Sequence, residues 1–125
     1  MIDHVSVGVR DLVVAARFYD ALLATLGYRR LDTRPQTVGW GKKYSDFWIN
    51  LRPNMSLIPP DSGVHICLRA TSKEAVDAFH AAALENGGAS DGAPGPRKND
   101  DARYYAAFIR DADGNRLEAV TFLDR

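Results

Sequence analysis

Residues 63–70 read Gly63-Val64-His65-Ile66-Cys67-Leu68-Arg69-Ala70, and this stretch decides the fold. Along it, apolar side chains alternate with a histidine, a thiol and a guanidinium. An alternation with a period of two predicts a β-strand whose two faces meet different environments. We expect the apolar face to lie under a helix. The other face, with His65, Cys67 and Arg69, is then one wall of a metal-binding cup.

The same pattern opens the chain, where residues 2–9 alternate around His4. Each of these two predicted strands precedes an amphipathic helical pattern, over residues 12–26 and 73–86. Each helical pattern begins after a capping residue and stops at a glycine. His4 and His65 lie 61 positions apart, so the chain contains an internal duplication.

The rest of each half supplies further strands. They are predicted at residues 28–32, 36–40, 46–52, 104–110 and 116–123. Residues 88–103 are rich in Gly, Pro, Asp and Asn, and this composition predicts a mobile loop. We therefore predict an α+β fold: one domain, residues 1–125, made of a βαβββ module over 1–60 and a second over 61–125. With one helix per module, the uncovered sheet faces find shelter only by curling toward each other around a shared cup.

Composition excludes several classes of function. Sixteen basic residues balance sixteen acidic ones, so no net charge favours nucleic acid or an anionic membrane as a partner. No apolar run approaches the roughly 18 residues of a membrane span, and no basic-then-apolar leader opens the chain. The single cysteine excludes an intrachain disulfide. We expect a cytoplasmic protein with a small-molecule partner.

Three side chains are candidate metal ligands. By parity, His4, His65 and Glu118 face the cup from three different strands. Two imidazoles and a carboxylate suit a divalent cation such as Fe, Mn, Ni, Co or Zn, and leave coordination positions open for water or substrate. Glu118 could instead pair with Arg52 or Arg69, without any metal.

Further residues share the predicted cup. Trp48 offers an apolar wall, while Arg52 and Arg69 either bind a substrate anion or reach solvent at the strand ends. One of the adjacent residues Tyr104 and Tyr105 must face inward. We assign proton donation to Tyr105 and substrate binding to Tyr104. Glu118 is the second candidate catalytic residue. The candidate substrate-binding set is Trp48, Asn50, Arg52, Arg69 and Tyr104. Cys67 is read as a small core residue and His80 as a surface residue.

Three stretches carry a resemblance to a known family: Ile2-Asp3-His4-Val5, Gly63-Val64-His65-Ile66 and Phe108-Ile109-Arg110-Asp111-Ala112-Asp113-Gly114-Asn115-Arg116-Leu117-Glu118. Through them the chain resembles the vicinal oxygen chelate superfamily of glyoxalase I, bleomycin-resistance proteins, fosfomycin-resistance thiol transferases, methylmalonyl-CoA epimerases and extradiol dioxygenases. The resemblance implies that His4, His65 and Glu118 bind the metal. It also implies a homodimer in which the cup forms within one chain or across two.

The sequence departs from the family at one position. Glyoxalase I and the epimerases have a fourth ligand on the last strand of the first half, and Asn50, the predicted repeat partner of Glu118, matches that position. An amide oxygen is a weaker ligand than a carboxylate and is not a general base, which argues against glyoxalase I activity.

Two functional hypotheses follow, with a weaker third. The first is a metal-dependent enzyme acting on an oxygen-chelating substrate, as a lyase or isomerase, a dioxygenase or a thiol transferase. The second is a non-catalytic binding protein of the bleomycin-resistance type. The third is an interaction domain that uses its dimer surface.

Overall fold

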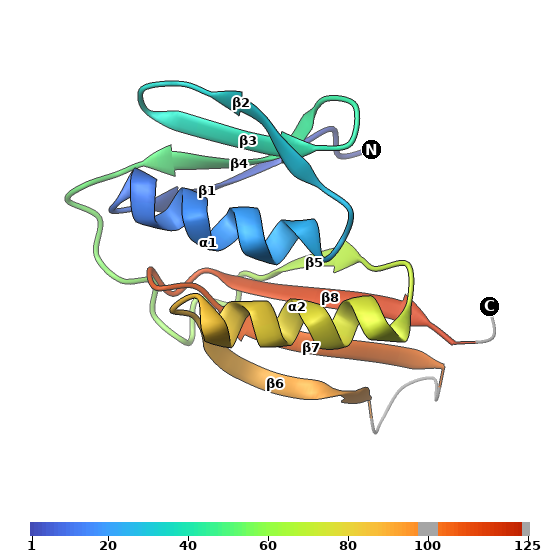
Figure 1. The fold of residues 1–125 in the computed structure, drawn as a ribbon. Coiled ribbons are helices and arrows are strands. Elements are labelled where there is room, and N and C mark those ends of the chain that lie inside the picture. The colour runs from blue at the N-terminus through green and yellow to red at the C-terminus, as the bar shows by residue number, and fades with distance from the viewer. Residues whose placement is uncertain (98–102, 124–125) are drawn as a thin grey trace.

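The computed structural model describes residues 1–97 and 103–123 and shows two modules, each with one helix and four strands (Figure 1). The first module contains β1 (Val5–Val9), α1 (Leu12–Ala24), β2 (Arg29–Thr33), β3 (Thr37–Gly41) and β4 (Ser45–Leu51). The second contains β5 (Ile66–Arg69), α2 (Lys73–Glu85), β6 (Ala89–Pro96), β7 (Tyr104–Arg110) and β8 (Arg116–Phe122).

Sheet topology confirms the predicted duplication. The strand orders are β1-β4-β3-β2 and β5-β8-β7-β6, so equivalent strands take equivalent places. In each sheet the first strand is parallel to the last strand of its module, and the other pairs are antiparallel. Among the described strands no pairing joins the two sheets, so they remain separate rather than closing into a barrel.

The helices begin where side-chain acceptors are available. The Asp11 carboxylate accepts from the Val14 amide at 3.1 Å, and the Ser72 hydroxyl accepts from the Ala75 amide at the same distance. These bonds satisfy amides that a first helical turn leaves free. Past the end of α1, Gly27 adopts a φ of 81°, the left-handed conformation that glycine takes without a Cβ clash.

The two helices pack against each other and cover their sheets from the same side, so the modules share one hydrophobic core (Figure 1). Tyr19 lies at its centre, with ring centroids 5.0 Å from Phe18, 5.9 Å from Trp40 and 5.1 Å from Phe47. No helix in the described part of the chain has the length and hydrophobicity to span a membrane.

One predicted element is wrong. The supposed loop over residues 88–103 contains strand β6, which pairs antiparallel with β7 at the edge of the second sheet. Its register shifts twice, between Ser90 and Gly92 and between Gly92 and Gly95. An edge strand with bulges tolerates the glycines and prolines that a central strand excludes. Residues 98–102 of the supposed loop lie outside the described residues.

Candidate functional site

Glu118 is the centre of the candidate site. It lies on β8 beside β5, where its Cα pairs with that of Cys67. Its neighbours Leu117 and Ala119 point into the core, so the alternation of the strand turns Glu118 to the open face of the sheet. Even there the residue is only 1% exposed. A buried carboxylate is costly unless partners satisfy both its oxygens.

Two side chains provide those partners. His65 Nε2 lies 3.1 Å from Glu118 Oε1, and the Tyr104 hydroxyl donates a short hydrogen bond to Glu118 Oε2. His65 directly precedes β5 and its side chain is 51% exposed, so this imidazole connects the buried carboxylate to solvent. We call His65, Glu118 and Tyr104 the carboxylate centre.

Two groups that lie next to Glu118 have raised pKa values. Burial and the hydrogen bond to Glu118 raise the pKa of the Tyr104 phenol. The neighbouring Cys67 is exposed on the open face of the sheet, so the predicted core position is wrong; partial desolvation and the charge of Glu118 raise the pKa of its thiol to about 11. Both groups therefore carry their protons at neutral pH, and Cys67 is not a ready thiolate nucleophile.

His4 lies apart from this centre. Its Nδ1 is 2.7 Å from Asp3 Oδ2, and both side chains are more than half exposed. Within residues 1–97 and 103–123 no three His, Cys, Asp or Glu side chains form a group able to hold a metal ion. However, His4 and His65 line the same cavity of about 400 Å³. The two imidazoles therefore share one opening, while Glu118 contacts only His65 and His4 is turned toward Asp3.

The register of the strands corrects the predicted role of Asn50. Helices α1 and α2 are offset by 61 positions, which makes Ser6 the repeat partner of Cys67. Ser6 pairs with Trp48 just as Cys67 pairs with Glu118. The repeat partner of Glu118 is thus Trp48 rather than Asn50, and an indole has no acceptor with which to bind a cation. Trp48 instead donates from Nε1 to the Ser45 carbonyl at 3.2 Å.

The other predicted cup residues are spread over both modules. Trp48 and Asn50 line a cavity of about 430 Å³ together with His4, and the Arg34 guanidinium stacks 4.9 Å from the Trp48 ring centroid. Arg69 stacks on Phe122 at 4.8 Å. Arg52 is exposed and donates to the Leu51 carbonyl. Neither arginine pairs with Glu118.

The predicted roles of the two tyrosines require a second correction. Tyr105 faces α2, where its hydroxyl donates to Asp77 Oδ1 at 2.6 Å, so it is not in the cup. Tyr104, with the opposite parity on β7, is the tyrosine that reaches Glu118.

Sequence reasoning also missed three charged residues at one end of the second sheet. Arg110 and Arg116 pair across β7 and β8, and both guanidiniums flank Asp91 of β6. Arg116 shares strand β8 and parity with Glu118, and this signal alone would have put Arg116 on the cup face.

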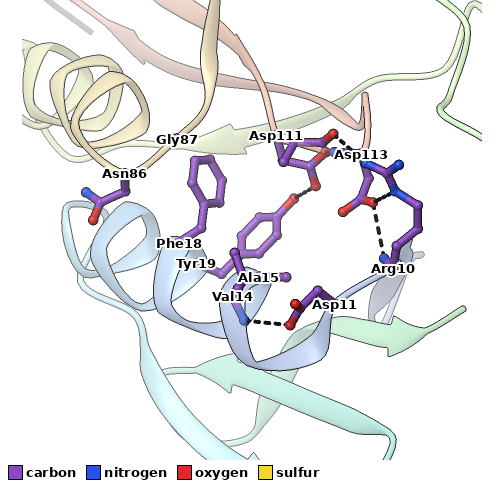
Figure 2. Close-up of a pocket in the computed structure, with 11 residues that line it drawn as sticks. Arg10, Asp11, Val14, Ala15, Phe18, Tyr19, Asn86, Gly87, Asp111 and Asp113 are labelled. Carbon is purple, nitrogen blue, oxygen red and sulfur yellow. Dashed lines mark hydrogen bonds and ion pairs between the residues drawn. The ribbon is translucent and has the colours of Figure 1, made fainter. Parts of the chain in front are cut away.

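The Asp-Ala-Asp-Gly-Asn turn, residues 111–115, joins the two modules. The Tyr19 hydroxyl donates to Asp111 Oδ2 at 2.6 Å, and Arg10 Nε donates to Asp113 Oδ1 at 2.7 Å (Figure 2). Asn115 Nδ2 donates to the Gly8 carbonyl at 2.9 Å. Burial raises the pKa of the Asp111 carboxyl, against the opposing effect of its hydrogen bonds. We call these cross-module hydrogen bonds the module clasp.

A cavity of about 330 Å³ lies beside the module clasp, between α1, the end of α2 and the turn (Figure 2). It shares no lining residue with the cavities at His65. Its charged side chains already have partners: Arg10 bonds Asp113, Asp111 accepts from Tyr19, and Asp11 caps α1. This cavity is therefore a feature of module packing, and the carboxylate centre is the stronger candidate site.

Comparison with known proteins identifies the family. Residues 1–119 match the model of the glyoxalase/bleomycin resistance protein/dioxygenase superfamily. A glyoxalase/bleomycin resistance protein from Albidiferax ferrireducens T118 is 36% identical over 94% of this chain and 95% of its own, with a TM-score of 0.80. No curated protein matches the chain.

More distant structures share the fold. A glyoxalase/bleomycin resistance protein/dioxygenase family enzyme from Burkholderia phytofirmans PsJN is 18% identical, with a TM-score of 0.71 and 98% of each chain covered. A glyoxalase-related enzyme from Fulvimarina pelagi is 13% identical, with a TM-score of 0.72 over 96% of this chain and 86% of its own. On the match over residues 1–119 and the 36% identity to a solved relative, the chain belongs to the glyoxalase/bleomycin resistance protein/dioxygenase superfamily.

Proposed function

We propose that this chain is a divalent-metal-dependent enzyme that acts on a small substrate bearing neighbouring oxygen atoms. His4, His65 and Glu118 are the residues that would hold the metal. The observation that carries this proposal is the buried Glu118 carboxylate in contact with His65, beside a cavity that His65 shares with His4.

When bound, the metal would act as a Lewis acid toward a substrate oxygen. The chain itself supplies orientation. Tyr104 fixes one oxygen of Glu118, and the other oxygen contacts His65. To join these ligands, His4 of this chain or of a second copy would exchange its exposed contact with Asp3, a contact of low cost to break because both groups are hydrated.

The residues present narrow the reaction class. Trp48 occupies the place of a fourth ligand, so no second carboxylate is available there to move a proton. Cys67 keeps its proton at neutral pH and is not an internal nucleophile. The proposed chemistry is therefore one in which the substrate or a co-substrate provides the nucleophile or oxidant, as in dioxygenases and thiol transferases.

Metal content tests the proposal. Protein purified without a metal-affinity tag is loaded with Mn, Fe, Co, Ni or Zn, desalted and measured by mass spectrometry. We expect one metal per chain in the wild type and little in His65→Ala or Glu118→Gln. His80→Ala is the matched control, because His80 lies outside the cup and contacts Ser90. Equal metal in all four proteins would refute the proposal.

A second candidate function rests on one observation. As placed, His4 turns to Asp3 and the ligand set is incomplete in the described residues. This favours a binding protein of the bleomycin-resistance type, in which the cup holds a ligand without chemistry. Such a protein would bind its ligand equally well in a chelator and in excess metal, and the enzyme would not.

We further propose that the protein is a homodimer, and mixing of variants tests whether the ligand set is shared. If His4 of one copy joins His65 of another, exchanging subunits between His4→Ala and His65→Ala proteins restores about a quarter of the sites. If the set forms within one chain, mixing restores none.

A further inference from the structure

His65 also lines a second, smaller cavity of about 190 Å³. It is lined by Gly63, Val64, His65, Asp91, Phe108, Arg116 and Leu117. Because His65 lines both this cavity and the one shared with His4, the two cavities meet at the carboxylate centre. We call the smaller cavity the arginine pocket.

Charge in the arginine pocket is unbalanced. Arg116 Nε lies 3.6 Å from Asp91 Oδ2, and Arg110 Nε lies 3.7 Å from Asp91 Oδ1. Asp91 is the only carboxylate within ion-pair distance of either guanidinium in the described part of the chain, so one positive charge is left over.

The hydrogen-bonding of the two arginines is also incomplete. Both Nε atoms are buried and have no hydrogen-bond partner, since the Asp91 oxygens lie just beyond hydrogen-bond distance. A guanidinium donates through a planar fork that matches a carboxylate bidentately, and leaving buried donors unmet costs free energy. The side chain of Arg116 is 27% exposed and lines the cavity, so an entering anion can reach it.

The walls of the arginine pocket select the kind of anion. Apart from the charged groups, Val64, Phe108 and Leu117 surround it. A single reachable guanidinium in an apolar setting fits one carboxylate on a short carbon chain. A phosphate carries more negative charge than a carboxylate, and Asp91, which lines the same cavity, repels it more strongly.

We propose that the arginine pocket binds the carboxylate of a short organic acid, with Arg116 as the binding residue, Arg110 as the second positive charge and Asp91 as a carboxylate that competes with the ligand for Arg116. This inference rests on the proposed function, since it places the carboxylate on one side of His65 and the reacting oxygens on the other. It names the substrate class: a small carboxylic acid with further oxygens.

The test uses propionate as the probe and neutral propionamide as its isosteric control, with metal-free protein and calorimetry at low salt. We expect propionate to bind and propionamide not to bind. Arg116→Gln should weaken propionate binding about tenfold or more, because a charge-assisted bidentate pair is lost. Arg116→Lys keeps the charge but not the fork and should lie in between. Asp91→Asn removes the competing carboxylate and should strengthen binding.

Matched controls separate this inference from the metal proposal. Arg17→Gln removes one positive charge from the exposed face of α1 and should leave propionate binding unchanged. The binding measurement uses metal-free protein, so its outcome does not depend on the proposed metal site. If Arg116→Gln fails to fold, the Arg116 Nε–Hε NMR signal of the wild type should still shift on adding propionate. Equal binding of propionate and propionamide, or equal affinity in Arg116→Gln and Arg17→Gln, would overturn the inference.

Discussion

The module clasp should contribute measurable stability, and Tyr19→Phe tests it. The substitution keeps the ring among Phe18, Trp40 and Phe47 and removes only the hydroxyl that donates to Asp111 Oδ2 at 2.6 Å. A buried hydrogen bond to a carboxyl group contributes about 1.5–3 kcal/mol. Because Asn115 Nδ2 still donates to the same oxygen at 2.9 Å, Asp111 is not left without a partner. We therefore expect a loss of about 2 kcal/mol.

Urea unfolding followed by tryptophan fluorescence measures this loss. With a slope of about 2 kcal/mol per molar urea, the midpoint should fall by about 1 M. Tyr44→Phe is the control, since Tyr44 is 65% exposed and should change the midpoint little. If Tyr19→Phe and Tyr44→Phe unfold at the same urea concentration, the hydroxyl does not hold the modules together and the reasoning fails.

Two further predictions concern the turn and the second helix. Gly114→Ala should destabilise the protein by about 3 kcal/mol or more, because its φ is 89° and an added Cβ would lie 2.6 Å from the Ile58 carbonyl oxygen. Gly87→Ala is the control. Gly87 has a φ of 95°, but no atom lies within 4 Å of an added Cβ, so we expect a loss of only about 1–2 kcal/mol. Equal losses of stability in thermal unfolding would contradict the clash at Gly114. The hydrogen bond to Asp77, followed by burial, raises the pKa of the Tyr105 phenol from 10.0 to about 12. The contribution of this hydrogen bond to stability is therefore complete below pH 10 and disappears as the pH rises through 12. The absorbance difference at 295 nm between wild type and Tyr105→Phe reports this phenol and should therefore titrate near pH 12. In an Asp77→Asn background the midpoint should be lower. A midpoint near pH 10 with and without Asp77→Asn would rule out this bond.

Much of the fold was predictable because both modules repeat the same local signals. The alternation around His4 and His65, each followed by a capped helix, was sufficient to predict two βαβββ modules. Strand β6 was missed because its sequence, Ala89–Pro96, contains glycines and prolines that only an edge strand with bulges tolerates. Composition alone does not distinguish such a strand from a loop.

The candidate site was predictable only in part. Parity placed His65 and Glu118 on one face, but both parities of β7 are apolar, so the sequence did not decide between Tyr104 and Tyr105. Trp48 and Asn50 also share one face, and only the register of β1 against β4 distinguishes them as partners of Glu118. Register depends on pairing between distant strands and is not fixed by a strand's own pattern.

The central claim is that a metal ion binds at the Glu118 carboxylate. Paramagnetic broadening of amide NMR signals by substoichiometric Mn²⁺ tests it most directly, because broadening depends steeply on distance from the ion. We predict that the amides around His65, directly before β5, and around Glu118 in β8 disappear first, and that Glu118→Gln abolishes this effect. Broadening centred on other carboxylates, or unchanged in Glu118→Gln, would contradict the account.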